Sequence, residues 1–247
     1  MKTPVMRKIL LPLLAGCALA LAPLTLPYAS GEEATSEDVA APLPTIELSP
    51  RTDLHQQRLE AVERYLNSVT TLRARFVQQA PDGSVSRGIF HLERPGRVRF
   101  EFEEAIPILI VSDGRILNMV DYELGQVTKW PIKDTPLALL VADEIVLGKN
   151  VTLVSSGPGE LANMISITAR NPKKPEQGTM TLIFSAEPAT GGGLPEMTLR
   201  AWQVIDAQGG LTTVTLAQME VNLVLDAALW KFKDPRGDRF KRRVRRR

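Results

Sequence analysis

A strict alternation of apolar and polar residues recurs along most of this 247-residue chain. In RVRFEFE, residues 97–103, Val98, Phe100 and Phe102 alternate with arginines and glutamates. Because successive side chains of a β-strand point to opposite faces, this period of two predicts a strand with one buried and one solvated face. The same pattern, less clean in places, predicts about eleven strands, at 73–80, 85–93, 97–103, 108–112, 115–121, 125–130, 151–155, 164–170, 179–185, 197–206 and 211–221.

Turn sequences separate these segments and favour an antiparallel meander. Examples are PDG at 81–83, SDG at 112–114 and QGG at 208–210, whose Asp and Gly residues suit tight turns between consecutive strands.

Helical patterns are few. One amphipathic helix is predicted before the strands, capped by Asp53, with Leu59, Val62 and Leu66 on its apolar stripe. A second helical piece, TPLALLVADEI, begins at residue 135, and a third short one covers 226–230.

Two or three short helices are too few to cover an eleven-stranded sheet as a separate layer. Such a sheet must curl, either closing into a barrel or wrapping as an incomplete barrel around the helices. Either shape has a concave apolar interior. The predicted fold class is therefore mainly β (α+β).

The N-terminal residues have the order of a secretory signal. Lys2, Arg7 and Lys8 precede an almost wholly apolar run from 9 to 26. Pro12 and Pro23 interrupt this run and no basic stop-transfer cluster follows, so a retained membrane helix is the weaker interpretation. We expect an exported chain.

Two cleavage sites compete in this signal. Cleavage after Ala29 leaves a polar terminus but places Pro27 where a small residue is preferred. Cleavage before Cys17, at the end of LLAGC, satisfies the lipoprotein rule and leaves a lipid anchor. The expected organisation is a signal peptide at 1–29, a disordered acidic linker at 30–50, one globular domain at 51–240 and a basic tail at 241–247. Cys17 is the only cysteine, so stability must come from a packed core rather than from disulfides.

The formal net charge of +2 hides an asymmetry. Residues 30–235 have 19 basic and 27 acidic residues, a net charge of −8, whereas RGDRFKRRVRRR at 236–247 has eight basic residues and one acidic residue. Near anionic lipid headgroups each Lys or Arg contributes roughly 1 kcal/mol, so contact with a membrane surface is one interpretation. The other is a solvated terminus without function. Few aromatic residues interleave with the basic ones, so we expect no nucleic-acid partner.

The chain contains no recognisable catalytic set. His55 and His91 are far apart in the sequence, and there is no G-x-S-x-G, H-E-x-x-H or Walker A motif. Glu101, Glu103 and Glu104 cluster, but the alternation with Phe100 and Phe102 assigns them to the solvated face. We expect no enzyme, no cofactor and no metal. A protein that binds an apolar ligand is favoured over an exported hydrolase.

Several stretches resemble the LolA family of periplasmic lipoprotein carriers. They are YLNSVTTLRARFVQ, the long run from RGIFHLERPGRVRFEFEEAIPILIVSDG to TPLALLV, and the C-terminal ALWKFKDPRGDRF. The resemblance covers nearly all of residues 54–240. It implies an incomplete antiparallel β-barrel of about eleven strands, wrapped around a lid of two or three short helices.

The resemblance also implies a function and partners. The family's members are periplasmic chaperones that accept acylated lipoproteins from an ATP-driven transporter of the inner membrane. They deliver these lipoproteins to the outer membrane, where an acceptor lipoprotein can receive them. We accordingly expect a periplasmic monomer. The alternative is a relative of the same fold, anchored through Cys17, that acts as an outer-membrane acceptor or a lipoprotein sensor. Only a soluble carrier can shuttle between membranes, so the resemblance favours Cys17 as part of a discarded signal.

Site residues follow from the same resemblance. Arg94, in ERPG, matches the family's strand-end arginine that ties the barrel to the lid by hydrogen bonds and gates it. Val98 and Phe100 fall where the family has bulky apolar residues at the cavity mouth. Because aromatic residues make up only 5% of the chain, we expect a more aliphatic lining. The predicted lipid-binding cavity residues are Leu59, Val62, Leu66, Val98, Phe100, Phe102, Met119, Leu137, Leu140, Met180 and Leu182.

Overall fold

The computed structural model describes residues 50–103, 106–147, 151–155, 163–170, 178–188 and 195–237. The predicted signal, both cleavage sites, nearly all of the linker and the basic tail lie outside these residues. Within the described part, no helix combines the length and apolarity that crossing a membrane requires.

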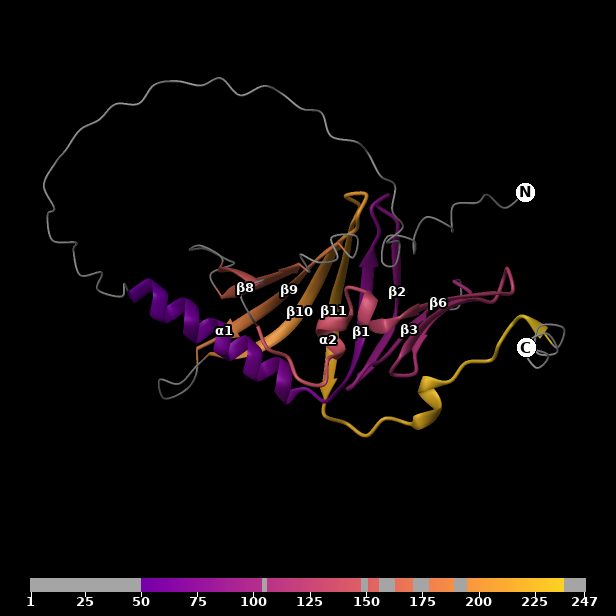
Figure 1. Cartoon of the computed structure of the whole chain (residues 1–247), viewed down its shortest axis with the longest axis horizontal. Coiled ribbons are helices and arrows are strands. Elements are labelled where there is room, and N and C mark those ends of the chain that lie inside the picture. The colour runs from indigo at the N-terminus through magenta and orange to yellow at the C-terminus, as the bar shows by residue number, and fades with distance from the viewer. Residues whose placement is uncertain are drawn as a thin grey trace, which may run out of the picture.

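Eleven antiparallel strands form one strongly curled sheet (Figure 1). Consecutive strands are neighbours in the order β6-β5-β4-β3-β2-β1-β11-β10-β9-β8-β7, so β1 also lies beside β11. Strands β6 and β7 are the two edges, and among the described strands the barrel is therefore open. The strands are β1 (Thr71–Gln79), β2 (Val85–Glu93), β3 (Arg97–Phe102), β4 (Ile108–Ser112), β5 (Ile116–Asp121), β6 (Gln126–Pro131), β7 (Val151–Ser155), β8 (Met164–Arg170), β9 (Thr179–Glu187), β10 (Glu196–Ile205) and β11 (Leu211–Val221).

The predicted strands and fold class are confirmed. Each of the eleven predicted segments contains a strand, and none is displaced by more than two residues at either end. Alternation succeeds here because the concave face is dry and most of the convex face is wet, as the burial pattern of β1 shows by changing at every residue.

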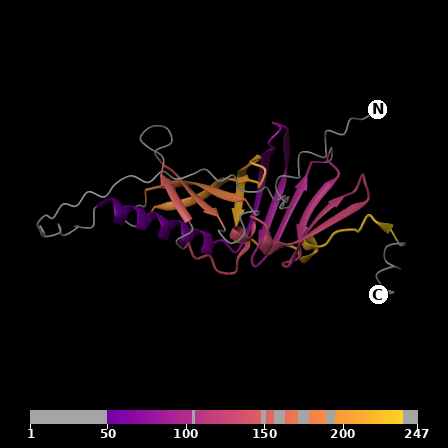
Figure 2. The same cartoon turned by 45° about the horizontal axis from the view of Figure 1, so that its top comes forward.

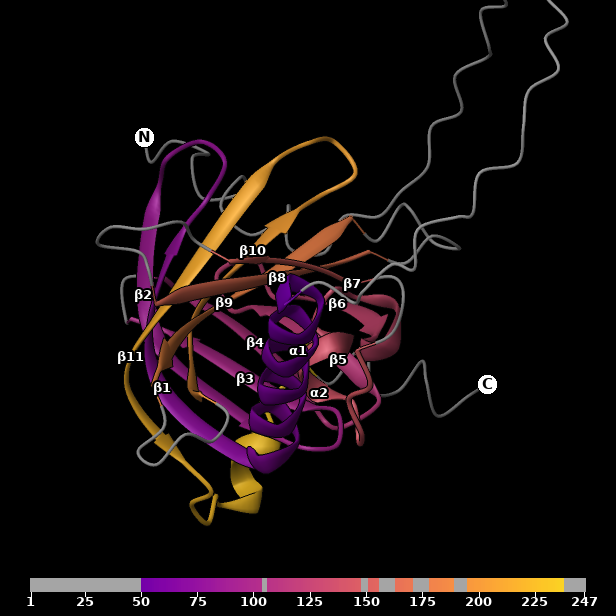
Figure 3. The same ribbon diagram turned by 90° about the vertical axis from the view of Figure 1, so that its left-hand side faces the viewer.

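The helices differ more from expectation. Helix α1 (Pro50–Ser68) is 19 residues long, not short, and it lies across the concave side of the sheet (Figure 3). It begins at Pro50, so the predicted cap at Asp53 is wrong. Proline suits a first helical position because its missing N–H has no partner there in any case.

The second and third helical pieces are short. Helix α2 (Ala138–Val141) follows the 3-10 turn η3 (Ile132–Asp134), and Thr135 closes that turn by donating its hydroxyl to the Ile132 carbonyl at 2.7 Å. The 3-10 turn η5 (Ala227–Trp230) confirms the third predicted piece. Its cap is the Asp226 carboxylate, which accepts a hydrogen bond from the Ala228 N–H at 2.8 Å.

The main core lies on the concave face. The sheet has two wings, one of β2–β6 and one of β7–β10, and β1 and β11 join them (Figure 2). Buried side chains from both wings, α1 and α2 form one continuous apolar cluster. A second, smaller cluster lies on the convex face and contains Leu109, Val111 and Val120, against which Val127 and Phe232 pack.

Candidate functional site

Helix α1 contributes one apolar stripe to the concave interior. Val62 and Leu66 are fully or almost fully buried, and Leu59 is half-buried against the same cluster. The ring of Tyr65 meets Phe184 of β9 edge-on, with centroids 5.9 Å apart. The helix therefore covers the wing formed by β7–β10, in agreement with its packing against β10.

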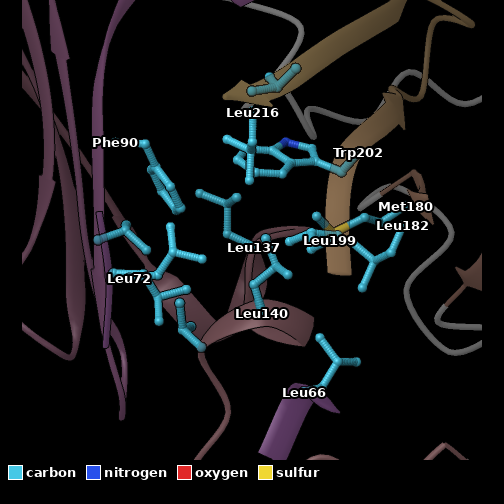
Figure 4. Packing of buried hydrophobic residues seen from close by; sticks show 14 of the residues in the cluster. Leu66, Leu72, Phe90, Leu137, Leu140, Met180, Leu182, Leu199, Trp202 and Leu216 are labelled. Atoms are coloured by element: carbon cyan, nitrogen blue, oxygen red, sulfur yellow. The ribbon is translucent and has the colours of Figure 1, made fainter. Parts of the chain in front are cut away.

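Helix α2 fills the middle of the interior. Leu137 and Leu140 are buried, and they point between Leu72 and Phe90 on one side and Trp202 and its neighbours on the other (Figure 4). Because these two leucines touch both wings, α2 occupies space that the sheet alone would leave open.

An aromatic group forms the centre of the interior. The ring of Phe100 lies 5.6 Å from Phe76, 4.7 Å from Phe90 and 6.2 Å from Trp202, measured between centroids. Phe102 lies 5.2 Å from Phe76. Whether the lining is more aliphatic than in other members of the family stays a prediction. The composition is poor in aromatics, but the curl of the sheet brings Trp202 of β10 against β2 and β3 and so concentrates them.

The interior is tightly packed in this conformation. Between α1, α2 and β2 lies a cavity of about 20 Å³, lined by Tyr65, Leu66, Phe90, Arg94, Leu140 and neighbouring apolar residues. A cavity of that volume has room for about one water molecule, so this space is far too small for an acyl chain. In the part of the chain that the structure describes, this space would admit such a ligand only if the two helices moved away from the sheet.

All eleven predicted cavity residues meet in this one interior. Nine of them are buried, whereas Leu59 and Met119 are half-buried at its margin. The structure therefore brings together every apolar residue that the sequence nominated, from α1, α2 and strands of both wings. Whether they bind lipid stays a prediction.

Arg94 follows the last residue of β2 and lines the small cavity. Its backbone N–H donates to the Thr70 carbonyl at 2.9 Å, which joins the end of β2 to the segment after α1. Its side-chain Nε is buried without a hydrogen-bond partner, and burial lowers the pKa of the guanidinium. Among the described residues, no hydrogen bond joins this guanidinium to α1 or α2, so its gating role stays a prediction.

A set of polar contacts that the sequence did not indicate fastens the lid. The Asn67 side chain of α1 donates to the Ile145 carbonyl at 2.8 Å and accepts from the Ile145 N–H at 2.9 Å. The Glu63 carboxylate accepts from the Leu147 N–H at 2.9 Å. We call these three hydrogen bonds the latch. They join α1 to the segment after α2, so the two helices form one cover.

The other end of the cover is also held by backbone groups. The Gly96 N–H, in the β2–β3 turn, donates to the Val141 carbonyl at the end of α2 at 2.8 Å. Asn222, with a left-handed φ of 57°, accepts from the Thr70 N–H at 2.9 Å and donates to the Ser68 carbonyl at 3.0 Å. Asparagine tolerates that backbone conformation better than most residues. Asn222 thus fixes the point from which α1 leaves the sheet.

Potential metal ligands are not grouped in the described part of the chain. In the ranges that the structure describes, no three His, Cys, Asp or Glu side chains are grouped so that they could hold a metal ion. His55 is exposed on α1 and His91 is buried on the convex side of β2, so the fold does not bring the two histidines into one site.

Comparison with known proteins identifies the family of this fold. The family model described as outer membrane lipoprotein carrier protein LolA matches residues 67–233. The chain belongs to the LolA family. Two relatives named outer-membrane lipoprotein carrier protein are similar over most of their length. That of Dechloromonas aromatica is 31% identical over 194 residues, which cover 74% of this chain and 86% of the relative. That of Methylococcus capsulatus is 31% identical over 191 residues, which cover 74% and 85%.

A solved LolA superfamily protein from Nitrosomonas europaea is more distant. It is 10% identical, covers 70% of this chain and 98% of its own, and has a TM-score of 0.36.

Proposed function

We propose that this protein is a periplasmic carrier, which binds the acyl chains of lipoproteins in its concave interior and delivers them to the outer membrane. The observation that carries the proposal is the interior itself: one continuous apolar cluster under a two-helix cover, in a chain of a family named for carrying outer-membrane lipoproteins. The function requires no catalytic step.

The physical problem is the transfer of acyl chains through water. Burying a CH₂ group contributes about 0.8 kcal/mol, so a lipoprotein with several acyl chains leaves a membrane only if another apolar environment replaces it. The interior supplies that environment when α1 and α2 move outward and expose Val62, Leu66 and Leu140 to the ligand. Acyl chains then take the places that these side chains fill in the empty protein.

Release needs the opposite step. Closure of the empty protein must be favourable enough to compete with bound acyl chains. The apolar contacts of the lid serve this purpose, and the latch adds hydrogen bonds that form only when α1 and the segment after α2 meet. Arg94, whose guanidinium lines the cavity between the helices, is proposed as a gate that favours the closed state.

The partners follow from the same scheme. An inner-membrane transporter that uses ATP supplies the energy for release from the first membrane, since the chain has no Walker A motif of its own. An outer-membrane acceptor lipoprotein receives the cargo where one exists. In this proposal the predicted secretory signal at 1–29 exports the protein to the periplasm, where it acts as a monomer.

Quenching of a single tryptophan tests the binding site. Trp202 is fully buried in the interior, whereas Trp230 belongs to η5, which packs on the convex side against β3. In the double variant Trp130→Phe, Trp230→Phe, a lipopeptide with brominated acyl chains should quench most of the Trp202 emission. The same peptide without acyl chains should leave it unchanged.

The matched control keeps the other tryptophan. In Trp130→Phe, Trp202→Phe the remaining Trp230 should keep its emission when the brominated lipopeptide is bound. Equal quenching of Trp202 and Trp230 would show that acyl chains do not enter the concave interior, and the proposal would fail.

A handover assay tests the gate: Arg94→Leu should load cargo normally but transfer it poorly, and unimpaired transfer would remove Arg94 from the mechanism.

A further inference from the structure

Polar side chains are buried at one end of the concave interior. This end, which we call the hairpin end, lies beside the β1–β2 and β10–β11 turns, and these two hairpins stand side by side at the top of Figure 1. The polar residues are Gln78 of β1, Ser86 of β2 and Thr212 of β11, each at most 2% exposed. Gln78 lies two residues after Phe76 and Thr212 two residues before Val214, and both apolar residues belong to the main core. Alternation therefore places the polar residues on the concave face, and Ser86 joins them because it pairs with Gln78.

The strand register brings Trp202 of β10 to the same place. Gln78 and Trp202 both pair with Val214, from opposite sides of β11, and Thr212 is the next concave residue of that strand. Diagonal neighbours in antiparallel strands are about 7–8 Å apart, within reach of an aromatic side chain. Figure 4 shows the indole nitrogen of Trp202 on the edge of the ring that is turned away from Leu140. We call the four side chains the polar patch: Gln78, Ser86, Trp202 and Thr212.

Three polar groups of this patch have nothing to bind in the closed protein. The hydroxyls of Ser86 and Thr212 and the indole N–H of Trp202 are buried without a hydrogen-bond partner. The other buried Ser, Thr and Asn side chains of the described ranges all make hydrogen bonds, namely Ser112, Asn118, Thr135 and Ser185. A buried polar group without a partner costs free energy, and folded proteins keep few of them. Their concentration in one patch indicates a ligand group that satisfies them.

The chemistry of the three groups selects the ligand group. An indole N–H can only donate a hydrogen bond, and a hydroxyl can donate one, so the patch suits an acceptor without donors of its own. The carbonyl oxygen of an acyl group is such an acceptor. We propose that the polar patch binds the carbonyl end of an acyl chain, whose hydrocarbon part then runs from the hairpin end toward Phe90 and Phe100. This inference rests on the proposed carrier function and adds the direction in which the ligand lies.

Arg94 is the competing place for the carbonyl end. It follows β2 at the opposite end from Ser86, eight residues further along the chain. A strand rises about 3.4 Å per residue, so the two places are about 27 Å apart along β2. Arg94 has one buried N–H group without a partner, Nε, whereas the polar patch has three such donors. A chain bound at Arg94 would lie in the opposite direction, so the two places can be told apart.

Paired lipopeptides test the role of the carbonyl group. The first has two palmitoyl chains joined by ester bonds to the glyceryl group of a modified cysteine, and the second is its ether analogue, in which CH₂ replaces each carbonyl. The unsubstituted protein should bind the ester form at least about tenfold more tightly, because only this form satisfies the buried donors. Equal affinities would overturn this inference alone. Failure of both forms to bind would overturn the carrier function and this inference with it.

A double variant assigns the preference to the polar patch. Ser86→Ala with Thr212→Val removes two hydroxyls and nearly keeps the shape of the side chains, so the preference for the ester form should fall to within about threefold. The urea midpoint should not fall, because the lost hydroxyls have no partner in the closed protein. The matched control Thr213→Val with Thr215→Val changes the opposite face of β11 and should keep the preference. An undiminished preference in Ser86→Ala with Thr212→Val, or a lowered midpoint, would overturn the inference.

The position of bromine along the acyl chain tests the direction. In Trp130→Phe with Trp230→Phe, Trp202 is the only tryptophan. Ester lipopeptides brominated in the first third of each chain, next to the carbonyl, should quench Trp202 more strongly than those brominated in the last third. Equal or stronger quenching by bromine in the last third, as a carbonyl end held at Arg94 would produce, would overturn the inference.

Discussion

The lid and the strap, which is the segment of residues 226–237 after β11, cover opposite faces of one sheet by opposite means. The lid, α1 and α2, contributes many apolar side chains to the interior, and its latch lies at the margin, where Asn67 and Glu63 reach backbone groups of the segment after α2. The strap contributes one aromatic anchor, Phe232, and carries exposed lysines on its outer side. The two covers thus differ in how much apolar surface they bury: the lid buries many apolar side chains, and the strap buries few.

We expect the lid, and not the strap, to open. The apolar contacts of the lid are of the kind that acyl chains also make, so a lipid ligand can take them over with little net change in buried apolar area. The latch is then the contact that distinguishes the closed state. The strap packs only Phe232 on the small convex cluster of Leu109, Val111 and Val120, so we expect it to stay in place when the lid opens.

The largest effect is expected from the centre of the interior. Phe100→Ala removes a fully buried ring that packs on Phe76, Phe90 and Trp202 and should lower the free energy of unfolding by about 3–5 kcal/mol. Urea unfolding measures it, and an acylated lipopeptide should restore part of the loss by filling the space. Val77→Ala, on the exposed face of β1, is the control and should cost less than about 0.5 kcal/mol. A loss under about 1 kcal/mol for Phe100→Ala would contradict the packing described above.

The strap should give a smaller and different effect. Phe232 is half-buried, so Phe232→Ala should lower the free energy of unfolding by about 2 kcal/mol, less than a fully buried ring. The affinity for acylated lipopeptide should not change, because the convex cluster is separate from the interior. A parallel measurement of unfolding and of lipopeptide binding checks both statements. A loss of affinity comparable to the loss of stability would break the distinction between the covers.

The sequence predicted the sheet well and the two covers poorly, for a physical reason. Alternation and turn sequences are local properties, so the strands could be placed from the residues themselves even where, as in β4, the alternation fails. The latch joins the Asn67 side chain to backbone groups of Ile145, which is 78 residues away in the sequence. A contact of this kind produces no repeating pattern of residues from which it could be predicted. Helix α2 was predicted too long because its sequence favours a helix beyond Val141, but Ile145 and Leu147 instead present their backbone groups to α1.

One signal for the strap was present in the sequence. Strand β4, ILIVS, does not alternate, and four of its five residues are buried. A strand of an otherwise one-sided sheet that is apolar on both faces must be covered on both. The outward-facing Leu109 and Val111 thus indicated that something lies on the convex face there. The sequence alone could not identify the segment around Phe232 as this cover. Phe232 lies far along the chain from β4, and a single aromatic residue has no repeating pattern that would predict where it packs.

The latch should have a moderate effect on stability and a clear one on motion. Asn67→Leu removes two hydrogen bonds to Ile145, each contributing about 1 kcal/mol, and keeps a side chain of similar size. The amide of Ile145 should exchange its hydrogen about tenfold faster, and lipopeptide should bind more tightly because less closure has to be undone. Gln56→Leu, which removes an exposed hydrogen bond within α1, is the matched control and should change neither quantity. Unchanged exchange in Asn67→Leu would show that the latch does not hold the lid.

The smallest effect is expected on the convex face, outside the apolar interior. His91 of β2 is 7% exposed and pairs across the sheet with Arg73 of β1 and Arg99 of β3. Its Nδ1 is buried without a hydrogen-bond partner. Burial, and then the charges of the two arginines, lower the pKa of this imidazole, whereas Glu101 opposes them.

The sign of the pH effect follows from the lowered pKa of His91. Above the unfolded-state value of about 6.5, the imidazole is neutral in both states and its titration adds nothing to the pH dependence. As the pH falls below about 6.5, the unfolded chain binds a proton that the folded protein does not, so the free energy of unfolding decreases until the folded-state pKa is reached. His91→Gln should therefore flatten the pH dependence of urea unfolding just below pH 6.5. Because His91 lies on the face of the sheet opposite the lid, lipopeptide affinity should be the same in His91→Gln and the unsubstituted protein at neutral pH. A change in that affinity would mean that the convex face communicates with the interior, and the separation of the two faces would have to be abandoned.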